Sequence, residues 1–158
     1  MSAGDEIQLV TFSIEGHEFG FNVFEVERVL RYEAPTPLPN APEYLEGTLR
    51  YGDDVVPVID LRKRVGAPAP IRDETRIVII EWGEGRIGVV VDVVLEVLRV
   101  PADRVKPPPT VIKRLTAEYI TGIVSTGERT LVMLAAAKLL SSTERVALDA
   151  LTAELPNV

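Results

Sequence analysis

Residues Leu45 to Leu61 read LEGTLRYGDDVVPVIDL, and this stretch predicts a β-hairpin. Its first arm, Leu45 to Tyr51, contains β-forming residues, and its second arm, Val55 to Leu61, is nearly continuous in β-branched and apolar residues. The Gly52-Asp53-Asp54 junction suits a tight turn, because glycine and aspartate tolerate positive φ angles. Pro57 lacks an amide donor, so we expect its strand to lie at a sheet edge or to carry a bulge there.

Working outward, the rest of the chain consists mostly of short apolar runs separated by glycine turns. Such runs predict about ten strands and few helices, which favours small β-barrels over an alternating α/β fold. The expected strands cover residues 7–14, 19–23, 45–51, 55–61, 76–82, 86–92, 93–100, 119–125 and 130–134. The apolar density of residues 76–100 indicates burial on both faces of the sheet.

Helical patterns are short and few. Val23, Val26, Val29 and Leu30 recur at helical spacing behind a suitable N-cap, Asn22, which predicts a short amphipathic helix that ends before Tyr32. A one-turn helix is expected at residues 61–65, capped by Asp60 and stopped by Gly66. Alanine, leucine and charged residues favour a C-terminal helix over residues 135–151, whereas four prolines in residues 34–42 predict an extended connector.

Composition limits the possible functions. The chain has 158 residues, of which 46% are hydrophobic, and it contains no cysteine, so a cysteine zinc site and a thiolate nucleophile are excluded. Its net charge of −7 disfavours nucleic-acid binding, and we interpret Arg62-Lys63-Arg64 as a solvated helix face. No signal peptide or run long enough to cross a membrane is present, so we expect a cytoplasmic protein that does not insert into the membrane.

A search for catalytic residues finds little. The single histidine, His17, is predicted to lie in an exposed turn between two glutamates, and the adjacent Asp53 and Asp54 are better explained by the turn than by acid-base catalysis. Asp60 and Asp92 follow apolar strands, where capping is favoured over metal binding. We therefore expect no catalytic residues, no bound metal and no cofactor.

The order of the motifs resembles that of CheW, the adaptor family of bacterial chemosensory arrays. The resemblance extends over about residues 6–145, and its combination of motifs is specific although each motif alone is weak. The matching segments are F-x-F-x-V-x-x-V-x-x-V at 19–29, PTPLPNAPEYLEG at 35–47, VVPVIDLRKRVG at 55–66, IGVVVDVVLEVLRVP at 87–101, the PPP run, EYITGI at 118–123 and LVMLAAAKLL at 131–140.

This resemblance implies one CheW-like domain, mainly β, made of two intertwined, SH3-like five-stranded β-barrels and a C-terminal helix. We place the first subdomain at about residues 6–70, the second at 71–134 and the helix at 135–151, with flexible ends at 1–5 and 152–158. The resemblance also implies a non-enzymatic adaptor that bridges the cytoplasmic tip of a chemoreceptor to the regulatory domain of a CheA-type histidine kinase. Assembly into arrays at the inner membrane is a further expectation.

Family position suggests several residues for partner binding. In the first subdomain they are Val26, Gly47 and Val55, and in the second they are Ile87, Val89 and Val91, which share one face of a strand. Core packing is the competing explanation for all of the valines and for Ile87.

The turn itself departs from the family pattern. Where the family usually reads G-V-I-N-L-R-G-x-I-V-P, this chain has GTLRYGDDVVP, so Gly52 and Asp53 stand at the Arg-Gly positions. Arg50 lies two residues earlier, on the same face of the strand, where it could substitute for the arginine. Arg28 replaces the family's glutamate. A changed surface could specify a different partner, so a diverged scaffold outside the kinase array remains the alternative function, and a small hydrolase that uses Asp53 or Asp54 is a third.

Overall fold

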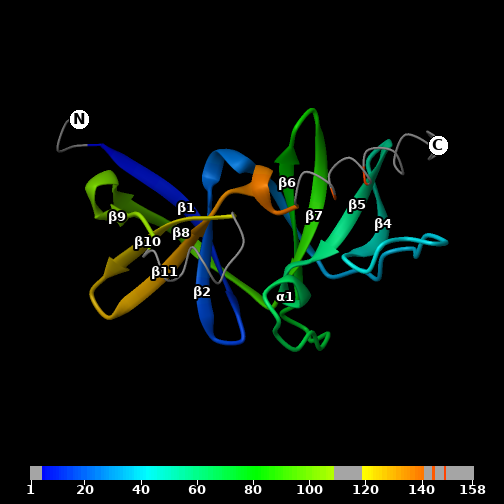
Figure 1. Cartoon of the computed structure of the whole chain (residues 1–158), viewed down its shortest axis with the longest axis horizontal. Coiled ribbons are helices and arrows are strands. Elements are labelled where there is room, and N and C mark those ends of the chain that lie inside the picture. Colours follow the sequence, from blue (N-terminus) through cyan, green and yellow to red (C-terminus); the bar gives the residue numbers. More distant parts are fainter. Residues whose placement is uncertain (1–4, 109–118, 141–143, 145–147, 149–158) are drawn as a thin grey trace.

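The computed structural model describes residues 5–108, 119–140, 144 and 148, and it is built mainly from β-strands (Figure 1). The strands are β1 (Glu6–Ile14), β2 (His17–Asn22), β3 (Val26–Arg31), β4 (Leu45–Tyr51), β5 (Asp54–Asp60), β6 (Arg76–Trp82), β7 (Gly85–Val91), β8 (Val93–Pro101), β9 (Val105–Lys106), β10 (Ile120–Thr126) and β11 (Arg129–Leu134). The short helices are η1 (Val23–Glu25), α1 (Leu61–Arg64), η2 (Ala102–Arg104) and η3 (Ala136–Lys138).

These strands form two sheets, which lie side by side in Figure 1. Sheet A has six strands in the order β8-β1-β2-β11-β10-β9, and sheet B has five in the order β3-β6-β7-β5-β4. The chain crosses from sheet A to sheet B at η1 and returns at Asp92, between β7 and β8. The sheets are therefore intertwined, and the expected boundary near residue 70 does not separate them, because strands from both sides of that residue pair within each sheet.

Each sheet has an apolar core of its own, and a third core joins the two. The sheet A core contains Leu9, Val100, Val124 and Leu131, and the sheet B core contains Leu49, Val56, Val58, Ile77, Ile79 and Val90. The joint core contains Phe12, Ile14, Phe21, Leu45, Ile59, Leu61, Val78, Ile80, Trp82, Ile87, Val89, Val91, Tyr119, Leu134, Ala136, Leu139, Leu140 and Leu148. Successive residues of β6 alternate between the sheet B core and the joint core, which confirms the predicted burial on both faces for this strand. For β8 the same prediction is wrong, because Val100 is its only buried residue.

The predicted hairpin is confirmed as β4 and β5, with Leu49 opposite Val56 and Tyr51 opposite Asp54. The expectation that Pro57 lies in an edge strand is wrong, because its strand, β5, lies between β4 and β7. The parallel pairing with β7 begins only at Val58, however, so Pro57 lies where no ladder bond to β7 is needed.

Three expectations about helices and charges are wrong or only partly testable. Residues after Asn22 form a single 3-10 turn, η1, and then the strand β3, because pairing with β6 outweighs the helical spacing of the valines. Arg62 does not face solvent but is fully buried, since Asp60 and other acceptors surround its guanidinium. In the expected C-terminal helix, residues 136–138 are 3-10 and residues 144 and 148 are helical, while the rest lies outside the described residues.

Two of the predicted capping residues, Asn22 and Asp60, are confirmed. Asn22 accepts from the Phe24 amide, and Glu25 reaches back to the Asn22 amide, which completes a capping box around η1. Asp60 caps α1 by accepting from the Arg62 amide at 3.0 Å. Local sequence therefore determines where these short helices begin, even where tertiary pairing limits their length.

Candidate functional site

The tip of the β4–β5 hairpin brings three of the sequence candidates together. Arg50 and Val55 are direct cross-strand partners, so their side chains share the outer face of the hairpin, where Arg50 is exposed and Val55 is half-buried. Gly52 forms the turn with a φ of +61°, and a Cβ built on it would meet nothing within 4 Å. The tip is thus an accessible surface with a fixed backbone shape.

Val26 lies on β3, at the opposite edge of sheet B, and is half-buried against the joint core. Two residues further along β3, Arg28 nevertheless reaches Tyr51 of β4, with its guanidinium 6.0 Å from the centre of the Tyr51 ring. This contact joins the two edge strands, so sheet B curls until its edges meet. We call this junction the seam and define it by Glu27, Arg28, Tyr51, Asp54 and Arg86.

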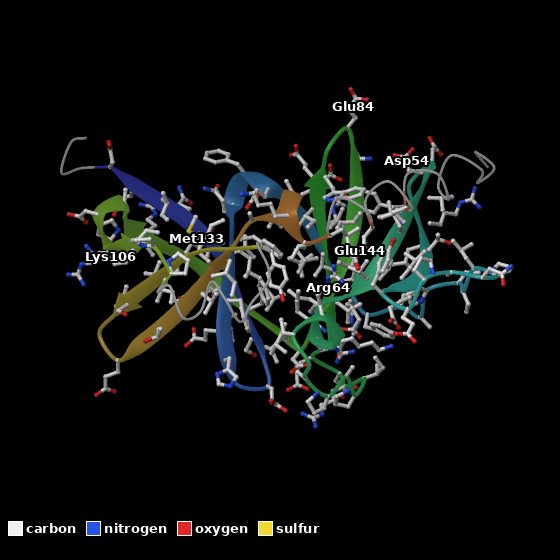
Figure 2. The ribbon with its side chains drawn as sticks, in the orientation of Figure 1. Asp54, Arg64, Glu84, Lys106, Met133 and Glu144 are labelled. Atoms are coloured by element: carbon white, nitrogen blue, oxygen red, sulfur yellow. The ribbon has the colours of Figure 1, made fainter. Side chains whose placement is uncertain are left out.

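Arg86 of β7 is the centre of the seam. Its Nε donates to Glu27 Oε1 at 2.8 Å, its Nη1 donates to Asp54 Oδ2 at 2.8 Å, and its guanidinium lies 5.6 Å from the centre of the Tyr51 ring. Arg28 approaches the same ring at 6.0 Å. Asp54 stands at the end of sheet B that also carries the β6–β7 turn with Glu84 (Figure 2). The seam therefore fixes the base of the hairpin tip through cation–π contacts and ion pairs.

The pKa shifts of Glu27, Tyr51 and Arg86 agree with the geometry of the seam. Hydrogen bonds from Tyr51 and Arg86 lower the pKa of the Glu27 carboxyl, because both stabilise the carboxylate. The same hydrogen bond to Glu27 raises the pKa of Tyr51, and Glu27 and Asp54 together raise the pKa of Arg86. At neutral pH the seam therefore holds an ionised Glu27 beside a neutral phenol.

Four candidates have no surface with which to contact a partner. Ile87, Val89 and Val91 do share one face, as predicted, but that face forms part of the joint core and all three are fully buried. Gly47 is buried too. Its φ is +146°, and a Cβ at this position would overlap the Thr36 carbonyl oxygen, so only glycine lets the backbone of the connector pack against β4. For these four positions, a direct role in binding is corrected to a role in packing.

The remaining polar candidates are accounted for by structure. His17 is exposed at the start of β2, and Asp54 pairs with Arg86. Asp60 and Asp92 both form ion pairs with Arg62. Asp60 also caps α1, as expected, whereas Asp92 does not act as a cap. Across the described part of the chain, no group of three or more His, Cys, Asp or Glu residues is placed to hold a metal ion. No helix among those residues is long and apolar enough to cross a membrane.

Sequence reasoning missed the exposed apolar side chains. Phe24 on η1 is 84% exposed, and Leu95 and Val97 on β8, an edge strand of sheet A, are 44% and 54% exposed. The sequence signal for this exposed surface was the number of apolar residues in residues 93–100, which is greater than one buried face of a strand can contain. It also missed the seam, whose residues come from four separate strands.

Two fused sheets with an exposed hairpin tip and an exposed apolar edge define a protein-docking module. The family model described as CheW-like domain matches residues 8–144. Chemotaxis protein CheW of Klebsiella aerogenes is 32% identical over 93% of this chain and 90% of its own length, and Chemotaxis protein CheW of Treponema pallidum is 33% identical over 91% and 88%. The crystal structure of the scaffolding protein TtCheW from Thermoanaerobacter tengcongensis superposes with a TM-score of 0.80, at 28% identity over 87% of this chain and 94% of that one.

The chain belongs to the CheW-like family, as its motifs indicated. The expected fold class, mainly β with two SH3-like subdomains, is confirmed, although sheet A has six strands and not five. Its function is that of a chemotaxis adaptor.

Proposed function

We propose that this adaptor bridges the cytoplasmic tip of a chemoreceptor to the regulatory domain of a CheA-type histidine kinase, without catalytic activity of its own. It would act in the cytoplasm, recruited to receptor arrays at the inner membrane. The observation that carries this proposal is the exposed tip of the β4–β5 hairpin, whose base the seam contacts through Tyr51 and Asp54. A preorganised surface loses less conformational entropy on binding than a mobile one does.

The kinase regulatory domain is assigned to this hairpin tip. Arg50, Gly52 and Val55 offer a cation, an open backbone turn and an apolar side chain within a few residues, and Val26 extends the surface along the other side of the seam. Central apolar groups surrounded by charges are typical of protein interfaces, in which a few residues supply most of the binding energy.

The receptor tip is assigned to the apolar surface formed by Leu95 and Val97 on β8. Both side chains are about half exposed, and exposed apolar groups on a soluble domain mark sites of interaction when they cluster. A helical partner can cover such a surface with its own apolar face. The two partners would then occupy different sheets of one molecule, which is what a bridging function requires.

A titration calorimetry assay with the cognate kinase regulatory domain tests the hairpin assignment. We expect Val26→Glu and Arg50→Ala each to weaken binding about tenfold, as is common for residues near the centre of an interface. Arg104→Ala provides the matched control, because Arg104 is also an exposed arginine but lies on η2, beside sheet A. If Val26→Glu and Arg50→Ala both leave the complex as tight as the control does, the assigned surface is wrong.

The alternative function is that of a diverged scaffold outside the kinase array, and the Gly52-Asp53 turn is the feature that favours it. Fluorescence microscopy of the tagged protein separates the two functions. Localisation with receptor clusters supports bridging, whereas a diffuse distribution at normal expression supports the alternative.

A further inference from the structure

Arg62 is a fully buried cation outside the docking surfaces, and all five of its side-chain N–H donors have acceptors. Nε and Nη2 donate to the two carboxylate oxygens of Asp60, both at 2.9 Å. Nη1 donates to Pro70 O at 2.5 Å and to Asp92 Oδ1 at 3.2 Å, and Nη2 also donates to Ala69 O at 3.3 Å. This one side chain of α1 thereby binds the end of β5, the loop after α1, and the crossing from sheet B to sheet A.

Asp92 extends this network into sheet A. While its Oδ1 accepts from Arg62, its Oδ2 accepts from the backbone amide of Glu15 at 2.8 Å. Glu15 and Gly16 form the β1–β2 turn with φ angles of +51° and +79°. The carboxylate therefore joins the tip of a sheet A hairpin to a buried cation on α1, the helix that follows β5 of sheet B, at the point where the chain passes between the sheets.

Apolar contacts alone would fix the angle between the sheets less sharply. The joint core holds the two sheets together, but hydrophobic burial is not directional, whereas charge-assisted hydrogen bonds require defined positions of donor and acceptor. Leaving a buried guanidinium partly unpaired is strongly unfavourable, so orientations that break the Arg62–Asp92 bond are disfavoured. The network therefore has the properties of a joint that selects one orientation.

We propose that Arg62 and Asp92 are positioning residues that hold sheets A and B at one angle, so that the hairpin tip and the β8 apolar surface can be engaged together in an ordered assembly. The part concerning assembly rests on the function proposed above. The part concerning the angle does not, because it concerns this chain alone.

Distance measurements between spin labels test the angle. The chain has no cysteine, so Glu84→Cys and Glu128→Cys, in exposed turns of sheets B and A, give one specific label pair. We expect a narrow distance distribution in the otherwise unchanged protein and a broader one after Asp92→Ala, which retains the other four bonds of Arg62.

Asp92→Asn is the second variant, because it preserves volume and one acceptor but cannot serve both Glu15 and Arg62 as a carboxylate does. Asp103→Ala, on η2, is the control and should leave the distribution narrow.

Binding experiments test the consequence for assembly. If the competent orientation falls to about a third of the population, the amount of kinase that sediments with receptor-bearing vesicles through this adaptor should fall about threefold. Binding of the isolated kinase regulatory domain to each variant should change less than twofold. A general loss of stability would instead weaken both the sedimentation of the kinase and the binding of its isolated domain.

An unchanged distance distribution in both folded Asp92 variants would show that the Arg62–Asp92 network does not hold the two sheets at one angle. A broadened distribution with unchanged sedimentation would overturn its role in assembly. Should the native protein bind neither partner, the proposed function would fail, but the distance measurements would still decide whether the joint exists.

Discussion

The guanidinium of Arg28 on β3 lies 6.0 Å from the centre of the Tyr51 ring on β4, across the two edges of one sheet, and the Tyr51 hydroxyl lowers the pKa of the neighbouring Glu27 carboxyl. These strands are at opposite ends of the order β3-β6-β7-β5-β4, so the contact exists only because the sheet curls upon itself. Curling of this kind leaves fewer open edges to pair with other chains, and here it also positions the hairpin tip.

Removing the Tyr51 hydroxyl should therefore raise the pKa of Glu27 in Tyr51→Phe. In the native protein this pKa is lowered first by Tyr51 and then by Arg86, so its contribution to stability is complete above the ordinary carboxyl pKa and is lost as pH falls through the lowered folded-state value. NMR titration of the Glu27 side chain measures the change. Tyr32→Phe removes the same group from a residue that also packs on the sheet B core and should leave Glu27 unaffected. Equal titration curves for native protein and Tyr51→Phe would contradict the assignment.

Gly47→Ala should destabilise the protein far more than Gly52→Ala. At Gly47 the new methyl group would overlap the Thr36 carbonyl oxygen and the backbone φ is +146°, so we expect a loss of about 3 kcal/mol. At Gly52 the space is open and only the positive φ is unfavourable, which costs about 1 kcal/mol. Urea unfolding gives both free energies. Comparable losses at the two positions would show that the connector does not constrain β4.

Local signals in the sequence predicted the hairpin and the caps because these features depend on neighbouring residues. The Gly52 turn, the Asn22 capping box and the Asp60 cap all involve residues within a few positions of one another. The helix predicted after Asn22 failed because its valine spacing also suits one 3-10 turn followed by β3, and pairing with β6 decided between them. Local patterns do not contain that long-range information.

Burial and the seam were harder to predict for the same reason. Ile87, Val89 and Val91 form a single face, but only the packing of two sheets shows that this face is covered. Arg62 looked like part of a solvated basic run, yet acceptors from residues 60, 69, 70 and 92 enclose it. Likewise, Glu27, Tyr51 and Arg86 meet only when sheet B curls. The family resemblance indicated the fold, but not which side chains remain accessible.

Substitutions in the core and at the surface should separate stability from binding. Val89→Ala should reduce the free energy of unfolding by about 2 kcal/mol or more, because it leaves a cavity in the joint core, while kinase binding by the folded protein stays unchanged. Arg50→Ala should change stability by less than about 0.5 kcal/mol and still weaken kinase binding. Chemical denaturation and calorimetry on the same samples measure both quantities. A folded Val89→Ala protein with lost binding would restore this residue as a contact.

The apolar surface on β8 gives the last prediction. Replacing Leu95 and Val97 together by serine should weaken binding of a receptor cytoplasmic fragment about tenfold or more, because two exposed apolar groups would no longer be buried by the partner. Stability should change little, since both side chains are already about half exposed. Ile71→Ser is the matched control, because Ile71 is 54% exposed, as Val97 is, but lies in the loop before β6. Analytical ultracentrifugation with the receptor fragment measures the complex. If Ile71→Ser weakens it as much as the double substitution does, the receptor does not select β8.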